Sequence, residues 1–254
     1  MRGPVIAKKH LGQHFLRDEN VAINIVEALP LDGFEQVIEI GPGDGVLSKY
    51  LLDRYENIKF FDVDQESITH LKNAYPMHRD KFVLQDFIAF KPSVQTAVIG
   101  NFPYNISSQI VFHILDHKEL FPVMVGMFQK EVAKRIASPP GSKEYGILSV
   151  LTQAYYELEY LFTVDEHVFE PAPKVKSGVI TMKRKANLTL DCDEKFFKAL
   201  VKKAFNQRRK MLRNSVKELL NEENIKLVQN YLEMRPEQLH FTDFVAISKA
   251  LFPR

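Results

Sequence analysis

The residues best suited to chemistry stand in one short run, Asn101-Phe-Pro-Tyr-Asn105, directly after an apolar stretch typical of a buried strand. The side-chain oxygen of Asn101 and a backbone carbonyl could accept hydrogen bonds from both hydrogens of an aromatic amine. The amine lone pair would then face an electrophile, and positioning would supply much of the rate. Pro103 would fix the backbone, and Tyr104 could stack on a base. The run therefore predicts group transfer to an exocyclic amine such as that of adenine, with a plain turn as the alternative.

A second aromatic residue, Phe169, opens the Pro-rich segment 169–177. A base that has left its own stack needs partners on both faces. Phe169 is therefore a candidate for the second face of the base, while Pro171 and Pro173 would stiffen the loop. The alternative is a buried aromatic side chain with no contact to a substrate.

A glycine-rich loop follows the strand expected at residues 36–40. Gly41, Gly43 and Gly45 give the spacing G-x-G-x-G, which permits a tight turn and lets a ligand approach the backbone. Such loops bind nucleotide-like cofactors at the carboxyl end of a sheet. The dinucleotide fingerprint has a sixth-position glycine, where this chain has Val46. The loop thus favours S-adenosyl-L-methionine (S-adenosylmethionine) over NAD, and a turn without a ligand stays as an alternative.

Acidic residues end the next two expected strands. Asp62 and Asp64 come about 20 residues after the glycine loop, where a carboxylate can bind ribose hydroxyls. We predict that Asp62 has this role. Asp86 ends the following strand and could accept a hydrogen bond from the adenine amine of the cofactor.

Apolar runs alternate with helical patterns through the first half of the chain. Strands are expected at 36–40, 58–64, 82–85, 96–100 and 123–128, with helices at 46–55, 68–75, 108–116 and 130–137. This alternation is typical of a doubly wound parallel sheet. Two strands at 158–164 and 177–182 have no helix between them, which predicts an antiparallel hairpin at one sheet edge.

Only helical patterns follow residue 184, at 194–205, 208–221, 225–231 and 243–251. The expected fold class is therefore α/β, a Rossmann-like methyltransferase domain over residues 1–186 with a small all-α domain over residues 187–254. The boundary is expected near residues 185–191.

Composition excludes several classes of protein. The hydrophobic fraction of 45% and charged fraction of 26% are ordinary for a globular protein. Cys192 is the only cysteine, and the eight histidines form no cluster with ligand spacing, so no metal is expected. No apolar stretch approaches the ~20 residues of a membrane helix, and the N-terminus lacks the apolar region of a signal peptide. We therefore expect a cytoplasmic protein with no membrane partner.

Charge is unevenly distributed along the chain. No acidic residue precedes Asp18, and residues 195–220 hold nine Lys or Arg and one acid, Glu218. Such asymmetry suits an anionic partner, and a solvated helical face is the alternative.

Taken together, these motifs resemble the adenine N6-dimethyltransferases of ribosomal RNA over nearly the whole chain. The resemblance begins at Lys8-Lys-His-Leu-Gly-Gln-His-Phe-Leu16 and runs through the segments 39–47, 62–64, 86–87, 101–105, 129–132 and 169–177 to Ala204–Asn214. It implies that Gln13 and Leu16 lie over the methionine end of S-adenosylmethionine, with His14 nearby, and that Phe87 joins Asp86 at the cofactor. Phe102 stands where relatives usually have an aliphatic residue, and Met211 and Asp62 are also departures.

The last segment separates subfamilies. Phe205-Asn-Gln-Arg-Arg-Lys210 with Leu212-Arg-Asn214 resembles the enzymes of the small subunit rather than the resistance enzymes of the large subunit. It implies that Arg208, Arg209, Lys210 and Arg213 bind RNA phosphates, which position RNA without reading its sequence.

The resemblance implies transfer of two methyl groups to each of two adjacent adenines in the 3′-terminal hairpin loop of small-subunit (16S) ribosomal RNA. The expected partner is that RNA in an assembling small ribosomal subunit, and the enzyme is expected to be a monomer. Two alternatives stay open: methylation of one large-subunit adenine that gives macrolide resistance, and a role mainly as an assembly factor that binds RNA. A dinucleotide-dependent oxidoreductase is a third, against which Val46 and the Asn101–Asn105 run argue.

Overall fold

The structure is a computed structural model that describes residues 5–253. The outermost parts of the two expected domains, residues 1–4 and 254, lie outside this range. Within it, contacts divide the chain into two compact units, one with residues 5–133 and 158–184, the other with residues 134–157 and 185–253.

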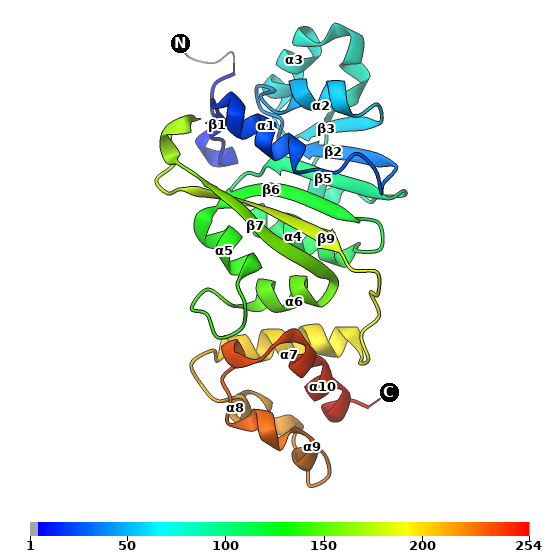
Figure 1. Cartoon of the computed structure of the whole chain (residues 1–254), viewed down its shortest axis with the longest axis vertical. Helices are drawn as coiled ribbons and strands as arrows, with labels where there is room; N and C mark the ends of the chain where they lie inside the picture. Colours follow the sequence, from blue (N-terminus) through cyan, green and yellow to red (C-terminus); the bar gives the residue numbers. More distant parts are fainter. Residues whose placement is uncertain (1–4, 254) are drawn as a thin grey trace. The chain divides into compact units, whose positions relative to one another are not determined.

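The first unit holds a mixed sheet in the order β4-β3-β2-β5-β6-β9-β7 (Figure 1). Five strands are parallel and apolar: β2 (Gln36–Ile40), β3 (Ile58–Asp62), β4 (Phe82–Leu84), β5 (Thr96–Asn101) and β6 (Val123–Gln129). Because both faces of a parallel sheet are covered, continuous apolar runs rather than alternating ones are stable there. The predicted α/β fold and its strand order along the chain are confirmed.

The remaining two strands close one side of the sheet. β9 (Ser177–Arg184) pairs antiparallel with β6, and β7 (Tyr156–Val164) is the edge neighbour of β9. The two strands predicted at the sheet edge are therefore present as neighbours, with the short strand β8 between them in the chain. A separate two-stranded sheet joins β1 (Phe15–Leu16) to β8 (Phe169–Glu170), which the sequence did not predict.

The strand order creates a switch point between β2 and β5. From β2 the chain adds β3 and β4 on one side, then returns to add β5 and β6 on the other side. The loops after β2 and β5 therefore diverge, and a crevice opens at the carboxyl ends of these strands. Both the glycine loop and the Asn101–Asn105 run lie at this crevice.

Helices α1 (Glu19–Glu27), α2 (Ser48–Arg54), α3 (Gln65–Ala74) and α4 (Ser107–Asp116) pack in this unit (Figure 1). Helix α1 was missed at the level of sequence. Its start is nevertheless encoded, because the Asp18 carboxylate accepts hydrogen bonds from the amides of Asn20 and Val21. Its apolar residues Ala22, Ile25 and Val26 are buried. Short 3-10 turns are η1 (Lys9–Leu11), η2 (Pro76–Lys81), η3 (Phe87–Ala89) and η4 (Glu166–Val168).

The second unit is helical. It holds α6 (Ile147–Tyr155), α7 (Glu194–Asn206), α8 (Leu212–Val216), η5 (Lys217–Leu219), α9 (Asn224–Leu232), η6 (Pro236–Gln238) and α10 (Phe241–Leu251), while α5 (Lys130–Ala137) runs from one unit into the other. Helix α7 packs against α6, α8 and α10. The chain returns to this unit at Lys185, next to the division expected at residue 186. Residues 134–157, which were expected in the first domain, belong to the second unit because α6 packs on α7 and α10. The proposed domain ranges stay a prediction.

One expected helix, residues 208–221, is much shorter in the structure. Residues 207–210 form a turn, and the helix begins only at Leu212, whose amide donates to the Met234 carbonyl at 2.8 Å. The Arg208 guanidinium donates to the carbonyls of Ser142 and Lys143. These contacts hold a turn where the helical pattern predicted a continuous helix over residues 208–221. Among residues 5–253 no helix is both long and apolar enough to cross a membrane.

Candidate active site

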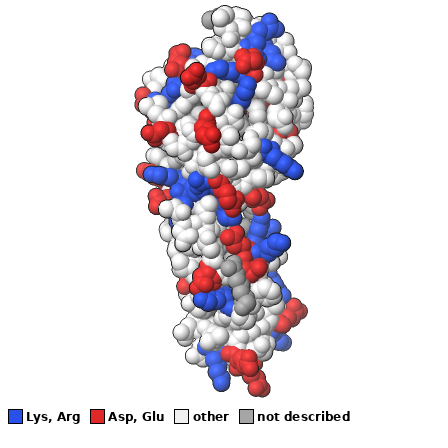
Figure 2. Space-filling view, turned by 90° about the vertical axis from the view of Figure 1, so that its right-hand side faces the viewer, with Lys and Arg blue, Asp and Glu red and all other residues white. Residues whose placement is uncertain are grey.

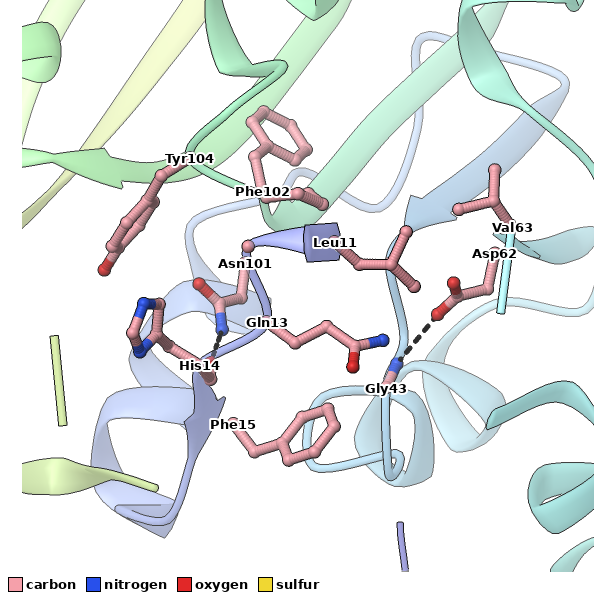
Figure 3. A pocket seen from close by; sticks show the side chains of 13 residues that line it. Leu11, Gln13, His14, Phe15, Gly43, Asp62, Val63, Asn101, Phe102 and Tyr104 are labelled. Atoms are coloured by element: carbon pink, nitrogen blue, oxygen red, sulfur yellow. Dashed lines mark hydrogen bonds between the residues drawn. The ribbon is translucent and has the colours of Figure 1, made fainter. Parts of the chain in front are cut away.

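One pocket lies at the switch point and brings together residues from four distant segments (Figure 3). Seven of the predicted site residues line it: His14, Gly41, Gly43, Asp62, Asn101, Pro103 and Tyr104. Six further residues line the pocket: Leu11, Gly12, Gln13, Phe15, Val63 and Phe102. Of these, only Gln13 had an expected role, which came from the family resemblance. The fold therefore joins the predicted cofactor loop to the predicted catalytic run.

The Asn101 amide has a defined orientation. Its Nδ2 donates a hydrogen bond of 2.8 Å to the backbone carbonyl of His14 (Figure 3). A carbonyl can only accept, so the amide nitrogen must face His14 and Oδ1 must face away from it. The N-terminal segment thus fixes the Asn101 amide with Oδ1 turned away from His14, an orientation that suits the acceptor role predicted for it; the role itself stays a prediction.

Behind Asn101, the Phe102 ring is buried in a space made by two glycines. A Cβ on Gly100 would lie 3.0 Å from the ring, and one on Gly126 would overlap it. The ring packs edge-on against Phe128, with centroids 5.1 Å apart. The bulky Phe102, where relatives usually have an aliphatic residue, is therefore accommodated because Gly100 on β5 and Gly126 on β6 have no side chains.

The glycine loop adopts a backbone that other residues rarely tolerate. Gly41, Gly43 and Gly45 have φ values of 67°, 57° and 92°. A Cβ on Gly43 would lie 2.8 Å from the Phe15 ring. Side chains at these three positions would therefore strain the loop, and one at Gly43 would also collide with Phe15 in the pocket wall.

Asp62 is buried at the foot of this loop. Its carboxylate accepts from the amide of Asp64 at 2.9 Å and from the amide of Gly43 at 3.4 Å. Burial raises its pKa, and these amide hydrogen bonds oppose the rise. The carboxylate lies at the pocket beside Val63, whose side chain is exposed (Figure 3). This geometry suits the predicted binding of ribose hydroxyls.

A second carboxyl group, that of Glu39, is fully buried nearby. Burial raises its pKa to about 8, while a 2.7 Å hydrogen bond from the Ser48 hydroxyl lowers it and the neighbouring Asp62 raises it further. Glu39 is therefore mostly protonated at neutral pH.

The N-terminal segment is fastened to the body at Asp64. Lys8 Nζ lies 2.5 Å from one carboxylate oxygen of Asp64, and Gln13 Nε2 donates to the other at 3.2 Å. Burial raises the pKa of Asp64, but hydrogen bonds from Lys8, Gln13 and the Glu66 amide hold it below its usual value. Asp64 therefore anchors the segment rather than facing the pocket. We call residues 8–16 the strap.

The strap also reaches Tyr104, the residue predicted to stack on a base. The His14 ring stacks on the Tyr104 ring, with centroids 5.3 Å apart and planes 27° apart, and His14 Nδ1 lies 2.7 Å from the Pro171 carbonyl oxygen. His14 was assigned to the cofactor from the family resemblance. In the structure its ring lies at the Tyr104 side of the pocket.

Four predicted site residues do not line this pocket. Leu16 and Phe169 are paired across β1 and β8, and both side chains are buried in the core. Asp86 caps η3 through the Ile88 amide, and the Phe87 ring is buried against His113 and Phe121. Their predicted contacts with base or cofactor stay predictions, and Phe87 could make one only through its backbone.

The predicted phosphate-binding residues differ in their surroundings. The Arg208 guanidinium donates hydrogen bonds to the carbonyls of residues 142 and 143, and Arg213 forms an ion pair with Glu233 at 2.6 Å. Arg209 and Lys210 are exposed. On the face seen in Figure 2, Lys and Arg are interspersed with Asp and Glu and form no continuous basic patch.

The pocket residues fit a nucleoside cofactor. Gly41 and Gly43 leave the backbone uncovered, Asp62 offers a hydroxyl acceptor, and Val63 offers an apolar surface. Among residues 5–253, no group of three or more His, Cys, Asp or Glu side chains is placed to hold a metal ion. Fold and site together define a class I S-adenosylmethionine-dependent methyltransferase.

Comparison with known proteins specifies the family. A family model described as ribosomal RNA adenine dimethylase matches residues 6–251. The chain is 51% identical to ribosomal RNA small subunit methyltransferase A of Flavobacterium johnsoniae, over 97% of this chain and 96% of the relative. It is 50% identical to the protein of the same name from Cytophaga hutchinsonii, over 97% and 98%. The chain belongs to the ribosomal RNA adenine dimethylase family.

Solved structures agree on the fold. A dimethyladenosine transferase from Plasmodium falciparum matches with a TM-score of 0.81 and 24% identity, over 92% of this chain and 96% of that one. The 23S rRNA methyltransferase ErmE matches with a TM-score of 0.72 and 24% identity, over 93% and 99%. At these identities the likeness establishes the fold alone.

Proposed function

We propose that this chain methylates the N6 amine of adenine in small-subunit ribosomal RNA, transferring two methyl groups to each of two adjacent adenines in the 3′-terminal hairpin loop. One observation carries the proposal: Asn101 Nδ2 donates to the His14 carbonyl, which turns Oδ1 away from that carbonyl in a pocket that Tyr104 and the glycine loop also line. The relatives named ribosomal RNA small subunit methyltransferase A indicate which RNA is the substrate.

The chain's residues activate the amine by binding it. The amine lone pair is delocalised into the adenine ring, and two acceptors at its hydrogens restore a tetrahedral nitrogen. Asn101 Oδ1 is one acceptor. The carbonyls of Pro103 and Tyr104 accept from the Ile106 amide and the Ser107 hydroxyl, so the Phe102 carbonyl is the candidate for the other.

The cofactor supplies an electrophilic methyl group on a sulfonium. The amine becomes acidic as it is alkylated, so no strong base is required in the pocket. Tyr104 has a pKa raised by burial and stays a neutral phenol, suited to stacking rather than to proton abstraction. In-line positioning of the amine is the main contribution of the protein.

The partner we propose is an assembling small ribosomal subunit in the cytoplasm, approached by a monomeric enzyme. The exposed Arg209 and Lys210 lie in the turn after α7, where they can contact phosphates. Phosphate contacts would add affinity without sequence selection.

The decisive test transfers radiolabelled methyl from S-adenosylmethionine to under-methylated small subunits and separates the labelled nucleosides by chromatography. We expect label in N6,N6-dimethyladenosine, and its loss in Asn101→Ala. Label on large-subunit RNA alone would overturn the proposed substrate. No label on either subunit, with RNA binding intact, would instead support a role as an assembly factor.

A further inference from the structure

A buried hydroxyl lies behind the base-stacking tyrosine. The Ser177 Oγ and Tyr104 Oη atoms are 2.6 Å apart, although the residues are 73 positions apart in the chain. Ser177 is fully buried, at 0% exposure. The hydroxyl of Ser177 is thus removed from solvent and paired with the phenol of Tyr104.

The reversed strand of the sheet delivers Ser177 to this place. In the parallel part, Asn101 ends β5 beside Met127 of β6. Ser177 opens the antiparallel strand β9 opposite Gln129, the last residue of β6. A strand that runs antiparallel begins at the edge where parallel strands end. Ser177 therefore enters the sheet at the edge that carries the Asn101–Asn105 run.

The position of the Tyr104 ring depends on contacts with other segments of the chain. It lies in the turn between β5 and α4 rather than in a helix or strand, and its backbone carbonyl accepts from Ser107. A stacking ring has to be held in a defined plane to orient a base, and supporting hydrogen bonds provide that rigidity. The Ser177 hydroxyl binds the ring at its far end, while His14 stacks on one face.

We propose that Ser177 is a positioning residue: its hydroxyl holds the Tyr104 ring in the plane on which the target adenine stacks. The proposal rests on the proposed function. It assigns to Ser177 an effect on base orientation, with no direct contact to base or cofactor.

The test compares Ser177→Ala, Tyr104→Phe and the double variant, because both single changes remove the same hydrogen bond from opposite sides. Tyr104→Phe leaves the buried strand position unchanged, so the test survives if Ser177→Ala fails to fold. Thr96→Val is the matched control, since Thr96 is a buried hydroxyl at the opposite end of β5, bonded to the Val94 carbonyl.

Two readouts separate positioning from structure. In methyl transfer, we expect kcat to fall roughly fivefold to tenfold in each single variant, with KM for RNA and cofactor affinity little changed. The double variant should fall no further than Tyr104→Phe alone. With 2-aminopurine in place of the target adenine and S-adenosylhomocysteine bound, the fraction of fluorescence quenched by stacking should fall in both single variants. Thr96→Val should match the unaltered protein in all of these.

The proposal is overturned if Ser177→Ala leaves kcat and quenching unchanged, or if its effect adds in full to that of Tyr104→Phe. A fall in thermal stability with no change in quenching would show a purely structural role and would also overturn it. Failure of the unaltered protein to methylate adenine in small or large subunits would contradict the proposed function instead, and is recognised before any variant is compared.

Discussion

The Phe102 ring occupies the space that a side chain at Gly126 would need. Gly126 lies on β6, and Phe102 directly follows the end of the neighbouring strand β5, where it joins Asn101 to Pro103 in the run for which the catalytic role is proposed. Because Gly126 has no Cβ, the Phe102 ring can pack against β6 and hold the proposed catalytic run in its place after β5. A change at a residue that touches no substrate should therefore reach the active site.

We predict that Gly126→Ala lowers both stability and kcat, because the added methyl displaces the Phe102 ring and overpacks the core by about 1 to 3 kcal/mol. Phe102→Leu should recover part of the loss, since it removes the closest contact but not those with Phe128 and Met124. Urea denaturation and methyl-transfer rates of the two single variants and the double variant measure the coupling. Strictly additive effects would show that the ring does not transmit the change.

Asn101→Asp tests the orientation of the amide. Its carboxylate would place an acceptor against the His14 carbonyl, where Asn101 Nδ2 now donates. We expect kcat to fall by roughly 10- to 100-fold at neutral pH, the range for a lost hydrogen bond that leaves a buried acceptor unpaired. Residual activity should rise towards acidic pH relative to the unaltered enzyme, because a protonated Asp regains the donor. A pH–rate profile with the unaltered shape would refute this orientation.

The parts predictable from sequence are those in which local pattern and global fold agree. The strand β2 followed by Gly41, Gly43 and Gly45 is one such case. The apolar run predicts a buried strand, the spaced glycines predict a tight turn after it, and the structure has both. Phe169 is a contrary case: its place in a Pro-rich segment left a base-stacking role and a buried position both open, and the sequence did not show that it pairs with Leu16 and is buried. That pairing joins segments over 150 residues apart, and no local pattern records it.

The strap shows the same limit at the active site. Gln13 was placed near the cofactor by resemblance alone, and Lys8 had no predicted role. Their shared partner Asp64 was visible only as a neighbour of Asp62. Side-chain partners across such distances depend on the folded path of the chain. The continuous helix expected from residue 208 was wrong for a related reason, because the Arg208 guanidinium bonds the carbonyls of residues 142 and 143, which are distant in the chain.

Loosening the strap should weaken cofactor binding. Lys8→Met removes the cation that lies 2.5 Å from Asp64 and 3.1 Å from Glu66, while residues 11–15 of the strap line the pocket. We expect the Kd for S-adenosylhomocysteine to rise roughly threefold to tenfold, because binding must then also order the strap. Isothermal titration calorimetry measures the change. Lys9→Met, one exposed residue along, removes the same charge without the contact and serves as the control. Equal effects of the two variants would contradict the anchoring role.

The buried Glu39 should make stability depend on pH. Its pKa is raised in the folded state to about 8 from an ordinary 4.5. The folded form therefore binds this proton more tightly than the unfolded form does. The contribution of Glu39 to stability is fully present below pH 4.5 and is lost as pH rises to about 8. Glutamine cannot ionise, so the free energy of unfolding of Glu39→Gln should not fall in this way. The difference in free energy of unfolding between Glu39→Gln and the unaltered protein should therefore increase by up to about 5 kcal/mol over this pH range.

Urea denaturation of the cofactor-free protein at pH 5, 7 and 9 tests the Glu39 prediction. The difference between Glu39→Gln and the unaltered protein should grow from pH 5 to pH 8 and then level. Glu27→Gln, at an exposed position, should show no such trend. A difference that is constant across pH would mean that Glu39 is ionised in the folded protein throughout.

In the turn after α7, the exposed Arg209 and Lys210 should contribute to RNA binding, while Arg208 should contribute to stability. Arg209→Ala and Lys210→Ala should each weaken RNA binding and reduce the slope of log K against log salt by about 0.7 to 0.9, the effect of one lost phosphate contact. Arg208→Ala should chiefly lower the Tm, because its guanidinium bonds the carbonyls of residues 142 and 143. Filter binding across salt concentrations, with Lys226→Ala on α9 as the exposed control, separates these effects. A salt slope unchanged in both Arg209→Ala and Lys210→Ala would show that RNA does not contact this turn.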